Sequence, residues 1–275
     1  MERIIDFDHS PLHNRVYVNP NKSALMNSEI VFQGTGNVLF VEDGTKIDKS
    51  RIVFQSSNGV VYLSRSSDIL YLSLAVGQNS TVFIGRNCYF NGSINILATE
   101  WQNIILGCGS AFSFGIWIRT ADAHLIYDIK SGKRINHSRS ILIGDHVWVG
   151  QDSLILKGTQ IGSGSIIGGD STISGKRIPS NTLFAGSPAK LIRNGVLWTG
   201  PCTHTWSPQD TETWSEVSEI QANSWIYQKS STNLDLPEID RILQQQVDAG
   251  DRLSVIKKFL VGNQGKDRFY VDGSD

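Results

Sequence analysis

The sequence has few cysteines and no excess of charge of either sign. Three cysteines, Cys88, Cys108 and Cys202, are an odd number in a chain of 275 residues, which disfavours a disulfide framework. The 25 basic and 26 acidic residues give a formal net charge of −1. A nucleic-acid-binding protein would be expected to show a basic excess or a Lys/Arg run, so this class is excluded.

Long apolar runs are also missing. The N-terminal residues contain no apolar stretch of signal-peptide length. No later segment approaches the roughly 18 consecutive apolar residues of a membrane-spanning helix. We therefore expect a cytoplasmic protein with no membrane insertion.

Several motifs of nucleotide-binding proteins, hydrolases and metalloproteins are absent. The Gly-Lys pairs at 132–133 and 175–176 are each followed by arginine, whereas a P-loop needs Ser or Thr there. Ile167 stands where the third glycine of a dinucleotide fingerprint would follow Gly162 and Gly164. No G-x-S-x-G elbow occurs, and the six histidines have neither HExxH nor Cys/His finger spacing. No metal site is therefore expected.

The strongest pattern present is a strict interval of six residues. A helix repeats its apolar face every 3.6 residues and a strand every 2, so neither explains this interval, whereas a parallel β-helix does. The aliphatic members of the repeat are Ile143, Val149, Ile155, Ile161, Ile167 and Ile173.

A second, smaller residue accompanies each aliphatic one. We expect both to face the interior, with glycine-tolerant corners between them. Three hexads would then form one triangular coil, and coils would stack at about 4.8 Å, the spacing of hydrogen-bonded strands. The smaller residues, at the fifth place of each hexad, are Val147, Ser153, Thr159, Ser165 and Ser171.

The interval of six residues is less regular upstream of Ile143. Ile84, Phe90 and Ile96 are six residues apart, but Ile118 and Ile143 are separated by nineteen residues more than one hexad. A long loop must leave the β-helix there, and long loops on a regular scaffold commonly carry function.

Three regions follow from these patterns. Residues 1–40 form an N-terminal lead-in segment or irregular first coils, 41–193 carry the hexads, and 194–275 are a C-terminal extension. Within the extension, Pro237 opens an apolar helical pattern that Gly250 interrupts and Gly262 ends, which predicts two short amphipathic helices. We expect them to cap a β-helix edge or to pack against a neighbouring subunit.

Three segments occur here in combination: Ile143-Gly-Asp-His-Val-Trp-Val-Gly150, Ile161-Gly-Ser-Gly-Ser-Ile-Ile-Gly168 and Ala185-Gly-Ser-Pro-Ala-Lys190. Together they resemble the hexapeptide-repeat acyltransferases. The resemblance implies a left-handed β-helix, a homotrimer and active sites between neighbouring subunits. The segment Ile118-Arg-Thr-Ala-Asp-Ala-His-Leu-Ile-Tyr-Asp128 is similar to that of bacterial capsule and sialic acid O-acetyltransferases. Acetyl-CoA as donor and a carbohydrate as acceptor are therefore expected.

Acetyl transfer from a thioester to a hydroxyl requires a base, and histidine is the side chain that titrates near neutrality. His124 lies in the extruded loop, where the family's catalytic histidine falls. Asp122 could orient its imidazole, with Asp128 as the rival. Trp148 would border the acetyl-CoA and acceptor cleft in this family, although trimer packing is the alternative.

The resemblance also suggests groups that bind the thioester. The backbone amides of Gln151 and Gly169 are candidate oxyanion donors, and small residues at Gly168 and Gly169 would let pantetheine lie close to the backbone. The phosphates of CoA require cations, and four basic side chains near the last hexads could bind them. Alternatively, these four side chains form a solvated face. The candidate cations are Lys176, Arg177, Lys190 and Arg193.

Other histidines and tryptophans have plainer interpretations. His137 is expected on a loop surface, and His146 as a solvated or interface histidine. Trp198, Trp206, Trp214 and Trp225 of the extension are expected to pack in a core or interface, with glycan stacking as the alternative.

The leading interpretation is an O-acetyltransferase of a sialic-acid-containing capsular polysaccharide. The alternatives are an acetyltransferase of amino sugars or antibiotics, a zinc-dependent β-helix hydratase that uses His124, His137 and His146, and a non-catalytic scaffold.

Overall fold

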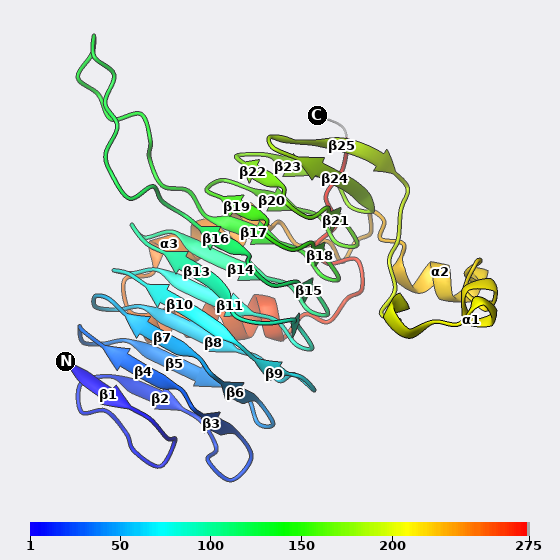
Figure 1. Cartoon of the computed structure of the whole chain (residues 1–275). Coiled ribbons are helices and arrows are strands. Elements are labelled where there is room, and N and C mark those ends of the chain that lie inside the picture. The colour runs from blue at the N-terminus through cyan, green and yellow to red at the C-terminus, as the bar shows by residue number, and fades with distance from the viewer. Residues whose placement is uncertain (274–275) are drawn as a thin grey trace.

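Short strands stack into a three-walled parallel β-helix with an arm and a C-terminal extension (Figure 1). The structure is a computed structural model that describes residues 1–273. It confirms the all-β parallel β-helix, the extruded loop and the two short helices predicted from the sequence.

Each wall is one face of the β-helix, and successive strands within a wall come from successive coils. The first wall comprises β1 (Glu2–Ile4), β4 (Glu29–Phe32), β7 (Arg51–Phe54), β10 (Leu72–Val76), β13 (Ile94–Ala98), β16 (Trp117–Arg119), β19 (Leu154–Leu156) and β22 (Thr172–Ser174). The second wall comprises β2 (Arg15–Tyr17), β5 (Val38–Val41), β8 (Val60–Leu63), β11 (Thr81–Ile84), β14 (Asn103–Leu106), β17 (Ile141–Ile143), β20 (Gln160–Ile161) and β23 (Arg177–Ile178).

The third wall is made of two sheets that meet where β9 contacts β12. Pairing is parallel throughout the walls except at β1–β4 and at the final hairpin β24–β25. The strands of this wall are β3 (Ala24–Met26), β6 (Lys46–Asp48), β9 (Ile69–Leu70), β12 (Tyr89–Phe90), β15 (Ala111–Phe112), β18 (Trp148–Val149), β21 (Ile166–Ile167), β24 (Thr182–Gly186) and β25 (Ala189–Asn194).

The hexad residues fill the interior. All six aliphatic residues of the repeat are 0% exposed, and the smaller residues at the fifth place are buried beside them. Phe32 stacks on Phe54 in the interior of the N-terminal coils, with ring centroids 4.7 Å apart. Burial of these stacked apolar side chains is therefore the main stabilising term along the β-helix.

Coil length explains why the repeat is strict in one half and ragged in the other. Ile155 pairs with Ile173, which stands three complete hexads further along the chain. Phe32 instead pairs with Phe54, a separation longer than three hexads, so the N-terminal coils carry additional corner residues. Parallel pairing of β2 with β5 shows that coils already begin within residues 1–40.

The helices of the extension cover the second wall. α3 (Leu236–Gln245), α4 (Ala249–Val255) and the adjoining π-helical turn η2 (Ile256–Val261) bury Leu236, Leu243 and Leu253 against this wall. The outward side chains of the wall, such as Tyr62 and Phe83, are themselves apolar and fully covered. The predicted helices thus cover a face of their own β-helix rather than only an edge.

A second part of the extension projects from the β-helix beside the third wall (Figure 1). It contains the 3-10 turn η1 (Thr203–Thr205), α1 (Pro208–Thr213) and α2 (Glu219–Trp225), none of which the apolar periodicity predicted. Ser207 and Asp210 form a capping box at α1, and Pro208 occupies its first turn, so local capping residues define this short helix. Among residues 1–273, no helix combines the length and apolar character needed to cross a membrane.

Candidate active site

Trp148 begins β18 and points away from the interior of the β-helix. Its neighbour Val149 is fully buried, so strand alternation places the tryptophan outside. The side chain is 42% exposed. Trp148 is therefore available as an apolar surface for a ligand or for another subunit.

Trp148 borders a stack of three aromatic rings. The Trp198 ring lies 6.2 Å from that of Trp148, at an interplanar angle of 48°. His146 lies between Trp198 and Trp225, with centroid distances of 4.0 Å and 3.9 Å and nearly parallel planes. Two tryptophans of the C-terminal extension thus pack around a histidine of the β-helix.

His146 is buried, so the expectation of a solvated or interface histidine is wrong. Its Nε2 lies 3.0 Å from the Trp198 carbonyl oxygen, and Trp198 Nε1 donates to the His146 carbonyl at 2.9 Å. Burial lowers the pKa of His146, which favours a neutral ring whose Nε2–H donates to this carbonyl. That hydrogen bond leaves Nε2 unsuited to bind zinc.

The arm, residues 120–139, leaves the β-helix between β16 and β17 and extends well beyond the coils (Figure 1). Tyr127 and Arg134 form an isolated β-bridge between the outgoing and returning halves of the arm, and Gly132 adopts a φ of 65° in the turn. Apolar side chains along the arm are half-exposed or more in this chain, which leaves a patch of a kind usually covered by a partner. They are Leu125, Ile126, Tyr127, Ile129 and Ile135.

Asn136 fixes the backbone around His124. Its Nδ2 donates to the His124 carbonyl at 2.7 Å and to Asp122 Oδ2 at 2.9 Å. Its Oδ1 accepts from the Ile126 amide at 2.9 Å. The His124 side chain is exposed while its backbone is held by a buried amide.

The two candidate orienting carboxylates have other partners. Asp122 forms an ion pair with Lys157, which lowers the pKa of Asp122 together with the Asn136 hydrogen bond. Asp128 accepts from Ser131 N and Oγ, both at 2.7 Å, and so stabilises the turn at the tip of the arm. Within residues 1–273 neither carboxylate is hydrogen-bonded to His124, and the orienting role of Asp122 stays a prediction.

Asn136→Ala should loosen the arm without changing the coils. The substitution leaves the His124 carbonyl and the Ile126 amide without their partner, which typically costs about 1–3 kcal/mol. Hydrogen exchange at the Ile126 amide should therefore become roughly tenfold faster or more, while amides of β17 keep their protection. Asn194→Ala, at an exposed position of β25, is the control; equal exchange rates in both variants would contradict this assignment.

Gln151, Gly168 and Gly169 lie at the corner that follows β18 and β21. A methyl group at Gly150 would stand 2.5 Å from the Gly169 nitrogen, so the coils approach closely here and require glycine. The amide of Gly168 donates to the Phe184 carbonyl at 2.8 Å within the ladder. In the described part of the chain, the amides of Gln151 and Gly169 donate to no protein atom.

The four candidate cations differ in their surroundings. Lys176 Nζ donates to the Ala189 carbonyl at 2.6 Å, which places it beside β25. Arg177 Nη1 donates to the Asp272 carbonyl at 3.0 Å, on the side of the second wall. Lys190 and Arg193 are exposed on β25 and form no ion pair with any described residue.

One chain does not bring His124 and Trp148 together. The arm leaves at the edge between the first and second walls, whereas Trp148 lies on the third wall. Figure 1 shows the arm and β18 on opposite sides of the β-helix. A site that uses both residues requires a second copy of the chain.

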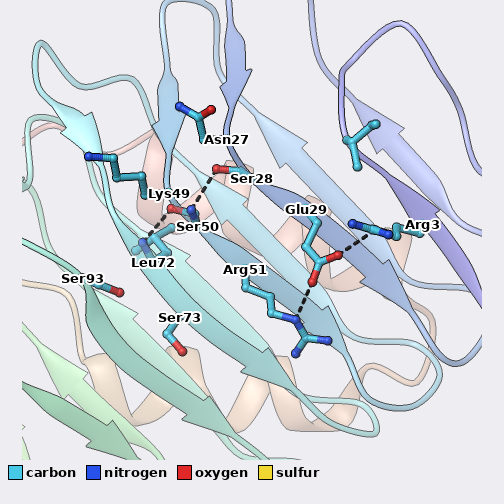
Figure 2. Close-up of a pocket in the computed structure, with 11 residues that line it drawn as sticks. Arg3, Asn27, Ser28, Glu29, Lys49, Ser50, Arg51, Leu72, Ser73 and Ser93 are labelled. Atoms are coloured by element: carbon cyan, nitrogen blue, oxygen red, sulfur yellow. Dashed lines mark hydrogen bonds and ion pairs between the residues drawn. The ribbon is translucent and has the colours of Figure 1, made fainter.

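The first wall carries a separate hollow of about 670 Å³ near the N-terminal coils (Figure 2). There Glu29 bridges Arg3 and Arg51, each at 2.6 Å, and these arginines lower the pKa of Glu29, Arg51 most strongly. The lining residues come from β1, β4, β7 and β10, from the corners beside these strands and, at Ser93, from the corner that precedes β13. None of the candidate site residues lies in this hollow.

Comparison with known proteins gives consistent matches. Residues 140–175 match the bacterial transferase hexapeptide family of six repeats. The polysialic acid O-acetyltransferase of Neisseria meningitidis is 27% identical over 183 residues, which are 66% of this chain and 84% of that protein. The polysialic acid O-acetyltransferase of Escherichia coli O1:K1 is 33% identical over 121 residues, 44% of this chain but only 39% of that protein. The crystal structure of the polySia-specific acetyltransferase NeuO superposes with a TM-score of 0.63 at 27% identity, and covers 74% of this chain and 94% of that one.

The chain is a hexapeptide-repeat acetyltransferase that resembles the polysialic acid O-acetyltransferases. It is therefore an acyltransferase enzyme. The roles of the individual site residues stay predictions.

Sequence reasoning about this acetyltransferase missed several residues around the candidate site. Asn136 was not singled out, although it holds the backbone of the arm. Arg268 is 2% exposed and pairs with Asp145 through two hydrogen bonds, of 2.7 Å and 2.9 Å. The sequence carries no local signal for this pair because its members lie far apart along the chain.

Proposed function

We propose that this acetyltransferase moves an acetyl group from acetyl-CoA to a hydroxyl of a bacterial surface carbohydrate, a sialic-acid-containing capsular polysaccharide. The observation that carries the proposal is the likeness over 74% of the chain to a polySia-specific acetyltransferase. The polysialic acid O-acetyltransferases of two bacteria support the same acceptor class.

In the proposed reaction the acceptor hydroxyl attacks the thioester carbonyl directly. His124 takes the hydroxyl proton as the new C–O bond forms. The free amides of Gln151 and Gly169 supply hydrogen bonds to the oxyanion of the tetrahedral intermediate. The intermediate then collapses, the C–S bond breaks, and the CoA thiolate takes the proton back from the imidazolium.

We further propose a homotrimer in which each active site forms between two copies. Its support is the position of His124 on an apolar, uncovered arm, away from the Trp148 of the same chain. Ile129 is 100% exposed, and burial of such side chains against a neighbour would stabilise the assembly by about 25 cal/mol per Å² of apolar surface. Trp148 of one copy would then face His124 of another.

The proposed function is tested by incubating the protein with acetyl-CoA and separate acceptors while CoA release is followed. We expect turnover with polysialic acid and sialosides, and none with amino sugars or aminoglycoside antibiotics. Mass spectrometry of the product should show an alkali-labile O-acetyl ester. Turnover of amino sugars alone would contradict the proposal and indicate an N-acetyltransferase.

Lys190→Ala and Arg193→Ala should each raise the KM for acetyl-CoA and nearly preserve kcat. Phosphate contacts remote from the thioester stabilise the ground state and the transition state alike. Increasing salt should weaken acetyl-CoA binding by the wild type more than by either variant. Salt screens the contact between cation and phosphate, and each variant has already lost one such contact. Arg241→Ala, which removes an exposed cation paired with Glu238, is the matched control. Identical salt dependence in all four proteins would assign Lys190 and Arg193 to a solvated face.

A further inference from the structure

The stack beside Trp148 presents a second aromatic surface, that of Trp198. His146 is buried below it, whereas Trp198 itself is half-buried and stands at an angle to the exposed ring of Trp148. Stacking on His146 and the two hydrogen bonds between these residues fix the orientation of the Trp198 ring. A rigid aromatic face next to a half-exposed one is suited to sugar binding.

A cavity of about 610 Å³ opens on this side of the molecule, between the β-helix and the extension. Trp198 lines it, so the ring is shared by this cavity and by the surface of Trp148. Polar groups able to bind hydroxyls, including Asn87, Ser224 and Gln264, lie along its walls. The cavity therefore offers space and polar partners for a sugar unit next to the one that Trp148 would contact.

The cavity also carries a positive charge without a carboxylate partner. Lys266 Nζ donates to the carbonyls of Asn223 and Ile226, each at 2.6 Å, and pairs with no acidic side chain of residues 1–273. The other two cations that line the cavity are already neutralised: Arg86 by Glu42, through hydrogen bonds of 3.0 Å and 3.2 Å, and Arg268 by Asp145. Lys266 is thus the cation of this cavity that can attract a sugar carboxylate.

We infer that Trp198, Lys266 and this cavity form an acceptor subsite for the anionic sugar unit next to the one that is acetylated. The inference rests on the proposed function, since it assumes a polymeric acidic acceptor. Trp198 stacks on the sugar, and Lys266 pairs with its carboxylate. His146 and Trp225 are positioning residues that hold Trp198 between the two surfaces.

The experiment compares kcat/KM for a monomeric sialoside with kcat/KM for oligosialic acids of increasing length. In the wild type the value should rise once a second unit is present. Trp198→Ala and Lys266→Met should each lower the oligomer-to-monomer ratio by roughly three- to tenfold, the range of one aromatic contact or one charge-assisted contact. The KM for acetyl-CoA should not change, and Trp198→Phe should recover part of the ratio.

Trp214→Ala is the matched control, because Trp214 is an exposed tryptophan of the same extension that stacks on Trp206, outside the cavity. A thermal melt would detect whether Trp198→Ala loosens the extension. In that case Lys266→Met still tests the subsite, because Lys266 is exposed and its substitution removes the charge without removing the aromatic stack. Wild-type ratios in both Trp198→Ala and Lys266→Met would overturn the subsite while leaving the proposed function intact. A wild-type protein that acetylates no saccharide would overturn the proposed function and the subsite together.

Discussion

Replacing His124 with alanine should lower kcat by roughly 10²–10⁴-fold, the usual contribution of one general base. The side chain makes no hydrogen bond within residues 1–273, and its backbone is held by Asn136 rather than by the imidazole. The variant should therefore keep the conformation of the arm, the oligomeric state and the affinity for acetyl-CoA. Steady-state kinetics measures kcat, hydrogen exchange reports on the arm, analytical ultracentrifugation gives the oligomeric state, and isothermal titration gives the affinity for acetyl-CoA.

His137 provides a matched control for this experiment. It lies on the returning half of the same arm and is exposed, as His124 is. His137→Ala should leave kcat within about twofold of the wild type, because the side chain is exposed and substitutions at the surface usually have small effects. Full activity of His124→Ala together with a loss in His137→Ala would transfer the role of base to His137.

The C-terminal hexads could be predicted in detail because each coil there is three complete hexads. Ile155 and Ile173 are paired neighbours on successive coils, and each of them fills the same interior position. The N-terminal coils are longer than three hexads and have corners of variable length. The interval of six is therefore lost from one wall to the next, although Phe32 and Phe54 still stack in the interior. Periodicity thus finds coils only where corners have constant length.

The long gap before Ile143 correctly located the arm, since a regular coil has no other place for nineteen additional residues. The burial of His146 could not be predicted in the same way. A fourth-place residue of a hexad points outward, but here Trp198 and Trp225 arrive from the C-terminal extension, far later in the chain, and cover it. Contacts at such sequence separation have no local signal, and the C-terminal extension consists largely of them.

The buried ion pair of Arg268 and Asp145 links the extension to the β-helix. Arg268 also donates to the Leu260 carbonyl at 2.7 Å and to Cys108 Sγ at 3.0 Å, while Asp145 Oδ1 accepts from the Cys108 amide at 2.6 Å. Burial acts to lower the pKa of Arg268, but the hydrogen bonds and charge of Asp145 outweigh it and raise this pKa, so the guanidinium is charged. Removal of one partner would leave the other as a buried, uncompensated charge.

Arg268→Met should therefore destabilise the docked extension by about 3–5 kcal/mol. A fall of roughly 10 °C in Tm is expected, with faster proteolysis of residues after Asn194 than of the coils. Arg241→Met, which breaks only an exposed pair with Glu238, should change Tm little. Adding Asp145→Asn to Arg268→Met should restore part of the lost stability, because no buried charge is then left unpaired. Equal melting temperatures for Arg268→Met and Arg241→Met, or a double variant less stable than Arg268→Met alone, would show that packing of α3 and α4 holds the extension without this ion pair.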